Sequence, residues 1–186
     1  MKNFFSSRDL DILTSFVGSE LNFVAGPELW EYLSSDLIIL VCGENQIAMQ
    51  GDIFEGDFEG FQSDYSKINF LPPKQSELKA SIKKGFTYYF HAGEIVTRIS
   101  IIRDRVVHLN GSAVLWDYQS DSGVVFHLTN GAISISKLGY HDEMLQVTYF
   151  DSADLARLPD LNSHFESDLY TQYEFERKII SLPASN

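Results

Sequence analysis

The sequence predicts an α+β fold, mainly an antiparallel β-meander sheet with an N-terminal helix and short C-terminal helices. Two observations lead to this fold class. From residue 36 onward, apolar residues form short runs or alternate with polar ones, and turn residues separate the runs at regular intervals, as in sequential strands. Asn-Gly, the strongest short-range hairpin signal, occurs between such runs at 110–111 and again at 130–131.

The first expected element is a helix that begins near Ser7 and ends before Gly18. Ser7 can cap the helix, and two aspartates follow it where the helix dipole is positive. Leu10, Leu13 and Val17 recur at three- and four-residue steps, which is typical of a helix with one apolar face.

The segment after this helix predicts a short strand at 21–24 and a short helix at 28–33. An apolar run at 37–42 and an alternating run at 46–50 then flank a Gly-Glu-Asn turn. These two runs predict a hairpin.

Residues 51–61 contain three glycines and the tripeptide Phe-Glu-Gly twice. Because glycines interrupt regular strands, we expect a loop or bulged edge here, with Phe54, Phe58 and Phe61 turned inward. A further strand is expected at 68–71, where two prolines end it.

The predictions for residues 77–150 differ in how clear their sequence signals are. Residues 77–84 fit a helix or a strand, with the helix preferred. Runs at 86–91 and 94–102 predict a hairpin about Ala92-Gly93, and a Ser-Asp-Ser-Gly turn is expected at 120–123. The remaining strands are expected at 106–109, 113–118, 124–129, 132–137 and 145–150.

The faces of the later strands follow from alternation. Val124, Phe126 and Leu128 share one face, as do Ile133 and Ile135, and this face is expected to form the core. The acidic stretch 151–186 predicts one or two short helices against the sheet edge, although 173–177 also fits a strand.

Composition favours one folded domain over residues 1–186, with 44% hydrophobic and 13% aromatic residues. The lone Cys42 lies in an apolar run, cannot form an intramolecular disulfide and is expected to be buried. The sequence shows no signal peptide and no apolar span of about 20 residues, so we expect a cytoplasmic chain with no membrane partner.

The charge is strongly acidic, with 14 Lys and Arg against 26 Asp and Glu and a formal net charge of −12. Nucleic acid is disfavoured as a partner, because binding a phosphate backbone depends on Lys and Arg. Such a surface can serve solubility alone, or it can attract a basic protein partner.

No common catalytic motif occurs in the chain, and no cofactor or metal is expected. Spatial triads leave no fixed spacing, however. If His108 and His127 shared a sheet face, with Asp104 or Asp117 to orient them, they would form the site of a hydrolase or small-ligand binder. Unrelated surface histidines are the preferred interpretation.

The acidic segment after residue 51 is the preferred candidate site. It departs from a calcium-binding loop, because Phe54 and Gly56 stand where the second and third ligands belong. Carboxylates around aromatic side chains suit docking of a basic partner. The candidate binding residues are Asp52, Glu55, Asp57, Glu59, Phe54 and Phe58, together with Tyr140 and His141, which a loop at 139–143 displays.

Arg98, Arg103 and Arg105 are the only basic concentration within the predicted meander. Their guanidinium groups could bind a carboxylate or phosphate, or they could form a solvated strand edge, which is the commoner use.

These observations favour a non-enzymatic binding protein with an acidic, aromatic-bearing surface for a basic protein partner. A toxin-neutralising protein of the immunity type is one concrete version. The alternatives are a small-ligand binder or hydrolase that uses the strand histidines, and an oligomeric module that pairs through a sheet edge.

Overall fold

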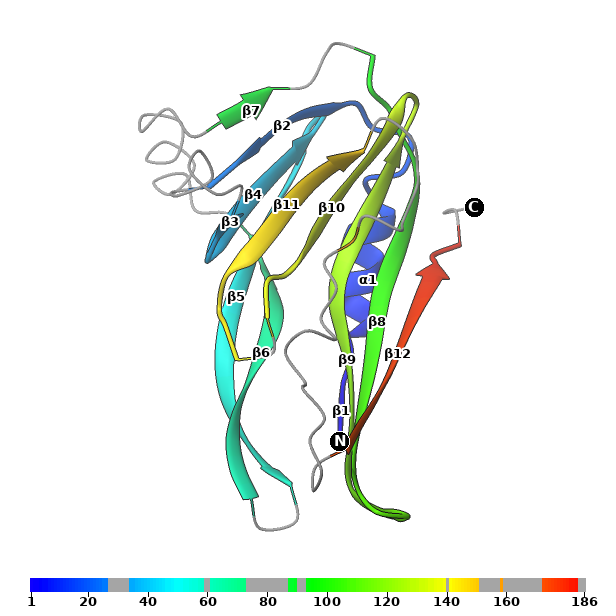
Figure 1. Ribbon diagram of the computed structural model, residues 1–186. Coiled ribbons are helices and arrows are strands. Elements are labelled where there is room, and N and C mark those ends of the chain that lie inside the picture. The colour runs from blue at the N-terminus through cyan, green and yellow to red at the C-terminus, as the bar shows by residue number, and fades with distance from the viewer. Residues whose placement is uncertain are drawn as a thin grey trace.

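The computed structural model describes residues 1–26, 34–58, 61–72, 87–89, 93–139, 141–150, 158 and 172–183. Most of these residues lie in the strands of two largely antiparallel sheets, and one helix, α1 (Ser7–Thr14), is present in the described ranges (Figure 1). The sheet-rich, antiparallel character predicted from the sequence is therefore confirmed.

The first sheet has the strand order β12-β8-β9-β10-β11-β3, and β1 pairs in parallel with β9 outside this path. Both hairpins predicted from Asn-Gly are present, as β8–β9 and β9–β10. Gly111 and Gly131 have φ values of 58° and 127°, a region that glycine adopts readily. The bounds are β12 (Gln172–Ser181), β8 (Val96–Asn110), β9 (Ala113–Leu128), β10 (Gly131–Lys137), β11 (Leu145–Phe150), β3 (Ser34–Ser35) and β1 (Lys2–Asn3).

The second sheet has the strand order β6-β5-β4-β2-β7. The predicted hairpin of 37–42 with 46–50 is confirmed, since β4 pairs with β5 from Leu37 opposite Gln50 to Cys42 opposite Asn45. The bounds are β6 (Phe61–Leu71), β5 (Asn45–Phe58), β4 (Leu37–Cys42), β2 (Leu21–Ala25) and β7 (Thr87–Tyr89).

The N-cap of helix α1 is Ser6, one residue before the predicted cap Ser7. The Ser6 hydroxyl accepts a hydrogen bond from the Asp9 backbone N–H, and the Asp9 carboxylate accepts one from the Ser6 backbone N–H. This reciprocal capping box satisfies two backbone donors that the helix itself leaves unpaired.

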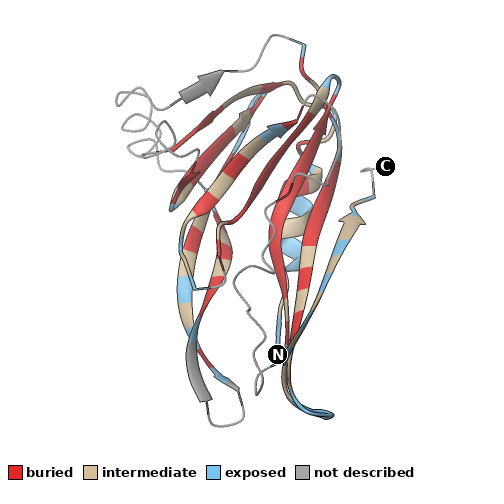
Figure 2. Cartoon of the chain, in the orientation of Figure 1, coloured by how far each residue is buried: buried red, intermediate tan, exposed pale blue. Residues whose placement is uncertain are grey.

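The largest of three buried hydrophobic clusters among the described residues lies between the sheets and against α1. Cys42 is fully buried in it, as predicted, and burial raises the pKa of its thiol to about 12. Buried residues fill the upper parts of β8, β9 and β10, whereas β12 and the lower tip of the β8–β9 hairpin are half-buried or exposed (Figure 2). Core residues include Leu13, Phe16, Ile38, Leu40, Ile47, Met49, Ile99, Ile101, Val124, Phe126, Leu128, Ile133 and Ile135.

The loop or bulged edge expected at 51–61 is wrong for its described residues. β5 continues to Phe58 and pairs with β6, from Ala48 opposite Leu71 to Phe58 opposite Phe61, without a register shift. Gly51 serves close packing, because a Cβ there would lie 1.7 Å from the backbone oxygen of Glu143. Glycine is therefore needed at position 51 because a neighbouring loop approaches closely, and it does not end the strand.

The hairpin expected from 86–91 and 94–102 is also wrong. β7 pairs with β2 in the second sheet, whereas β8 begins at Val96 and pairs with β9 and β12 in the first. Periodicity identifies a strand, but it does not identify the strand's partner.

The turn expected at 120–123 is wrong as well. β9 runs through it, with a register shift where Ile102 and Arg103 of β8 face Gly123 and Asp121. Ser120, Asp121 and Ser122 are all buried. Their short polar side chains are typical of turns, but here they bond to partners inside the fold.

The C-terminal end is a strand in its described part. β12 pairs with β8 along its whole length, so the strand alternative at 173–177 is confirmed. The helices expected at 28–33 and at 77–84 lie outside the described residues. Of the stretch 151–186, where one or two short helices were expected, residues 172–181 form a strand and residues 151–171, apart from Leu158, lie outside the described residues.

Candidate functional site

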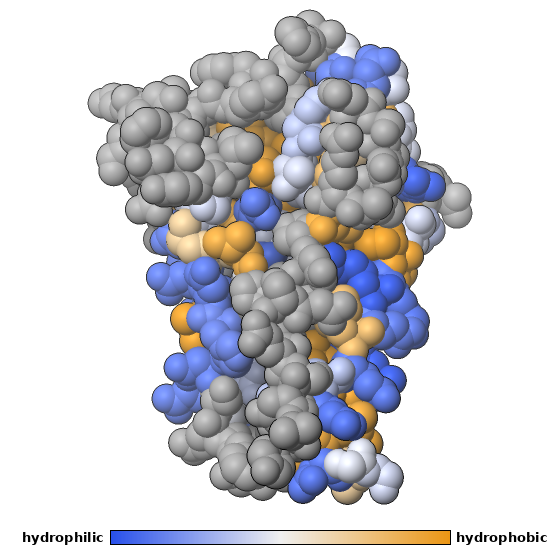
Figure 3. Space-filling model, viewed as in Figure 1, coloured by the Kyte–Doolittle hydropathy of each residue, from blue (hydrophilic) through white to orange (hydrophobic). Residues whose placement is uncertain are grey.

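Four carboxylates lie along the β5–β6 hairpin: Asp52, Glu55 and Asp57 of β5 with Asp64 of β6. Glu55, Asp57 and Asp64 share one face, and we call these three the acidic hairpin surface. Glu55, Asp57 and Asp64 are exposed and Asp52 is half-buried. In Figure 3, hydrophilic residues cover much of the described surface on the left, where β5 lies. Two of the predicted binding residues, Glu55 and Asp57, therefore share one face with Asp64, whereas Asp52 lies on the opposite face with Phe54.

Asp52, on the opposite face of the hairpin, has two partners. Its carboxylate forms an ion pair with Lys67 at 3.2 Å and accepts a hydrogen bond from the Asn69 amide at 3.1 Å. Burial raises the pKa of Asp52, but the hydrogen bonds from Lys67 and Asn69 outweigh this effect, and the pKa is lowered from its ordinary value. Asp52 is therefore negatively charged at neutral pH.

Glu55 and Asp64 are like charges on directly opposite positions of two antiparallel strands. Directly opposite side chains in such a pair lie about 5 Å apart at Cβ. Neither carboxylate forms an ion pair with a residue in the described part of the chain. The hairpin thus contains a repulsive contact between the Glu55 and Asp64 carboxylates, and no cation among the described residues pairs with either of them.

The aromatic residues expected at this surface are less exposed than the acids. Phe54 is half-buried, with its ring centroid 6.1 Å from that of Tyr65 and 5.8 Å from the Lys67 Nζ. The exposed apolar side chain beside it is Ile53, which is 37% exposed. The Phe58 side chain, Glu59 and Tyr140 lie outside what the structure describes.

His141 contacts the same hairpin, although it is distant in sequence. Its exposed side chain bonds through Nδ1 to the backbone oxygen of Asp64, and its ring centroid lies 5.5 Å from that of Tyr65. Two candidate segments that the sequence could not connect, the acidic stretch and the loop at 139–143, therefore meet. Among the described residues, no group of three His, Cys, Asp or Glu side chains could hold a metal ion.

The two strand histidines lie at opposite ends of the β8–β9 hairpin. His127 is opposite Arg98, and His108 is opposite Trp116. The ten residues between positions 98 and 108 span about 33 Å of strand, at about 3.3 Å per residue. Asp104 and Asp117 bond to arginines, so neither orients a histidine.

His127 has the nearest approach to a catalytic arrangement, with Nε2 3.0 Å from the Ser100 hydroxyl. Its Nδ1 lies 3.3 Å from an Arg98 nitrogen, which can only donate, so Nδ1 accepts and Nε2 carries the proton. Burial and then the Arg98 charge lower the pKa of His127. This tautomer donates to Ser100 and cannot take its proton, which is the reverse of a serine–histidine nucleophile pair.

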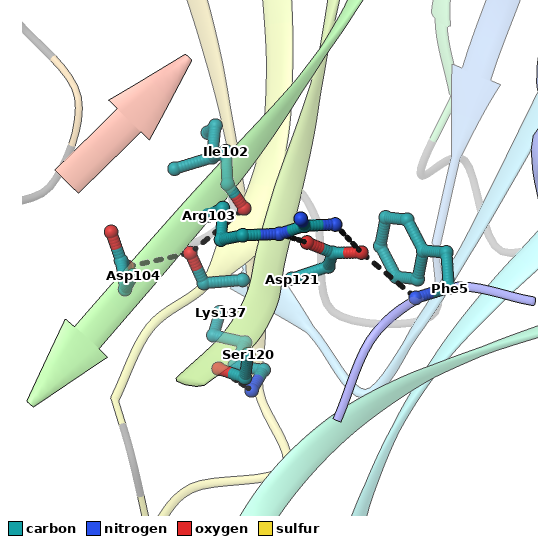
Figure 4. Close-up of polar contacts among 8 residues, drawn as sticks. Phe5, Ile102, Arg103, Asp104, Ser120, Asp121 and Lys137 are labelled. Atoms are coloured by element: carbon teal, nitrogen blue, oxygen red, sulfur yellow. Dashed lines mark hydrogen bonds and ion pairs between the residues drawn. The ribbon is translucent and has the colours of Figure 1, made fainter. Parts of the chain in front are cut away.

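A buried polar network occupies the place of the predicted turn at 120–123 (Figure 4). Asp104 is fully buried on β8 and accepts hydrogen bonds from Arg177 of β12, at 2.7 and 2.8 Å, and from the Ser122 hydroxyl, at 2.6 Å. Removing one partner of a buried ion pair lowers the free energy of unfolding by about 3–5 kcal/mol. The network therefore fixes β12, β8 and β9 against one another.

The second half of the network links the N-terminal segment to β8 and β9. Arg103 donates to Asp121 at 2.7 and 3.2 Å, and the backbone N–H of Phe5 donates to the same carboxylate at 2.8 Å. Lys137 donates through Nζ to the backbone oxygen of Ser66 at 2.6 Å and to the Ser120 hydroxyl at 3.2 Å.

Sequence reasoning missed this network, although one signal was present. Arg103-Asp104-Arg105 alternates charge along β8, and adjacent residues of a strand point to opposite faces. Arg103 pairs with Asp121 and Arg105 with Asp117 across the β8–β9 hairpin, while Asp104 pairs with Arg177 on the other side. The arginines are therefore on a central strand, not at the solvated edge that we had expected.

Comparison of the chain with known protein families, curated proteins and solved structures finds no match. In the described ranges, the helix is too short and too polar to span a bilayer.

Proposed function

We propose that the protein is a non-enzymatic binding domain that presents the acidic hairpin surface to a basic protein partner. The observation that carries this proposal is the pair of Glu55 and Asp64, exposed and directly opposite on β5 and β6. Like charges in this arrangement destabilise a sheet by about 0.2–1 kcal/mol. A cationic side chain of a partner would relieve that repulsion, so the free protein carries strain that binding removes.

The surroundings of this pair suit an interface. Ile53 offers an exposed apolar side chain, and His141 adds a ring at the hairpin's flank. An interface of this kind takes its affinity from apolar anchors and its association rate and orientation from charge. The formal net charge of −12 extends the attraction beyond the contact itself.

A neutraliser of a basic toxin or nuclease is the concrete form of this proposal. Proteins that act on nucleic acid carry basic surfaces, and an acidic domain that covers such a surface blocks it. This step is an argument from chemical class, because fold does not establish function.

The test uses Glu55→Gln, which removes one charge of the repulsive pair and keeps the side-chain size. We expect urea denaturation of the free protein to show a gain of about 0.5 kcal/mol in the free energy of unfolding. We also expect slower association with a basic protein that co-purifies in equal amount from host extract. That rate should fall several-fold between about 0.05 and 0.5 M salt.

Glu44→Gln is the matched control, because Glu44 is an exposed acid in the turn between β4 and β5. It makes the same charge change away from the acidic hairpin surface. If Glu55→Gln and Glu44→Gln change stability and association equally, the surface has no special role. A co-purifying partner with an acidic surface would also contradict the proposal.

A further inference from the structure

A pocket of about 220 Å³ opens on one face of the first sheet. Three adjacent strands line it, with Arg103 opposite Lys178, and Arg105 opposite both Gln119 and Glu176. Ile180 supplies an apolar wall. The lining residues are Arg103 and Arg105 of β8, Gln119 of β9, and Glu176, Lys178 and Ile180 of β12.

Arg103 is held in a fixed position at this pocket. Its Nε and Nη2 donate to Asp121, which is itself buried and bonded to the backbone N–H of Phe5 (Figure 4). Its guanidinium carbon lies 3.7 Å from the centroid of the Phe4 ring. Stacking and a bidentate ion pair together restrict the guanidinium plane before any ligand arrives.

Arg105 is fixed in the same way two residues along β8. Its Nε donates to Asp117 at 3.0 and 3.1 Å, and its Nη2 donates to the same carboxylate at 2.6 Å. The hydrogen bond from Arg105 lowers the pKa of Asp117, so this carboxylate stays ionised and keeps holding the guanidinium. The two arginines share one face of the strand, about 7 Å apart.

Both guanidinium groups keep donors for a ligand. A guanidinium has five N–H donors, and the bonds to Asp117 and Asp121 use only Nε and Nη2. No hydrogen bond from Nη1 of either arginine joins it to the described part of the chain. Two rigid guanidinium edges therefore border the same pocket.

The local charge is more balanced than that of the whole chain. Lys2, opposite Gln119 on β1, joins Arg103, Arg105 and Lys178 as cations. Asp117, Asp121, Glu174 and Glu176 are the carboxylates nearby. Four cations against four carboxylates leave these groups neutral in sum, in a protein of net −12.

We propose that this pocket binds a small oxyanion, a phosphoryl or carboxylate group, between Arg103 and Arg105, with Lys178 as a third donor. Two fixed guanidinium groups match the several oxygens of such an anion. The volume of about 220 Å³ exceeds the roughly 30 Å³ share of one water several-fold, so the group fits without rearrangement of the strands. Glu176 limits the site to compact anions, because it repels carboxylates placed beyond the arginines.

The experiment is calorimetric titration of the protein with inorganic phosphate, and separately with acetate, at low ionic strength. We expect saturable binding at one site for at least one of the two anions, and the tighter one identifies the preferred group. Arg105→Gln should weaken binding about tenfold, since it removes a charge-assisted hydrogen bond. Lys178→Gln should weaken it about threefold.

Arg8→Gln is the matched control, because Arg8 is an exposed cation on α1. This substitution removes the same charge as Lys178→Gln, but away from the pocket. Lys178 is 63% exposed, so its substitution tests the site even if Arg105→Gln disturbs folding, which circular dichroism would reveal. No saturable binding of either anion up to about 20 mM would overturn the proposal. Equal weakening by Lys178→Gln and Arg8→Gln would overturn it too.

Discussion

Lys137 shows how one buried charge joins the two sheets. Its Nζ donates to the Ser66 backbone oxygen on β6 and to the Ser120 hydroxyl on β9, and the residue is 1% exposed. Burial lowers the pKa of Lys137 to about 7, although Asp104 and Asp121 favour the charged form. Both aspartates are already paired with arginines, which limits how far they support the lysine.

This lysine predicts a pH dependence of stability. The unfolded chain holds the proton up to about pH 10.5, whereas the folded chain releases it near pH 7, so the unfolded state binds more protons between these values. Stability contributed through Lys137 should therefore rise with pH through this window and be lost as pH falls to 7. From pH 7 to 8.5 the gain is about 1.5 kcal/mol.

Urea denaturation of the wild type and of Lys137→Met at several pH values measures this effect. The difference between the two proteins isolates Lys137 from other groups, including Cys42, whose thiol begins to ionise in the unfolded chain within this pH range. A wild-type curve that runs parallel to that of Lys137→Met would show that the lysine is protonated in the folded state throughout.

At the scale of elements, the sequence predicted the strands better than their partners. The hairpins β4–β5, β8–β9 and β9–β10 follow from local signals, because their turns and strands are contiguous. The pairings of β7 with β2 and of β12 with β8 join distant segments, and no local pattern encodes them. The same holds for the contact of His141 with Asp64.

Two local sequence signals predicted a loop and a turn that are absent from the described strands, and the two errors have the same cause. Gly51 and the segment Ser120–Gly123 have residue types typical of loops, yet they lie inside β5 and β9. In each case another segment approaches closely: the Glu143 backbone at Gly51, and Ser136 at Gly123, where a Cβ would lie 2.6 Å from the serine Cβ. Small residues there serve tertiary contacts, which sequence propensity does not register.

Gly51→Ala tests this interpretation of β5. The added Cβ would lie 1.7 Å from the Glu143 oxygen, so the loop before β11 must move. We expect a loss of about 2 kcal/mol or more in the free energy of unfolding, by denaturant titration. Gln50→Ala, at the preceding half-buried position, should cost less than about 1 kcal/mol. Equal effects of the two substitutions would mean that Gly51 is not needed for the packing.

At the scale of the whole molecule, the charges divide into two groups that salt should affect differently. The pairs Asp104–Arg177 and Asp121–Arg103 involve buried carboxylates and are weakly screened. The exposed carboxylates of the acidic hairpin surface repel one another and the rest of a chain of net charge −12. Exposed ion pairs, such as Asp52 with Lys67, oppose this repulsion but contribute about 0–1 kcal/mol each.

Repulsion should therefore dominate the response of the free protein to sodium chloride. Raising salt from about 0.02 to 0.5 M shortens the Debye length from roughly 20 Å to roughly 4 Å and should raise the melting temperature. The double variant Glu55→Gln with Asp64→Asn should gain less from salt, because its hairpin repulsion is already removed. A melting temperature that falls with salt would show instead that attractive surface pairs outweigh the surplus of carboxylates, and the reason for expecting a basic partner would then be lost.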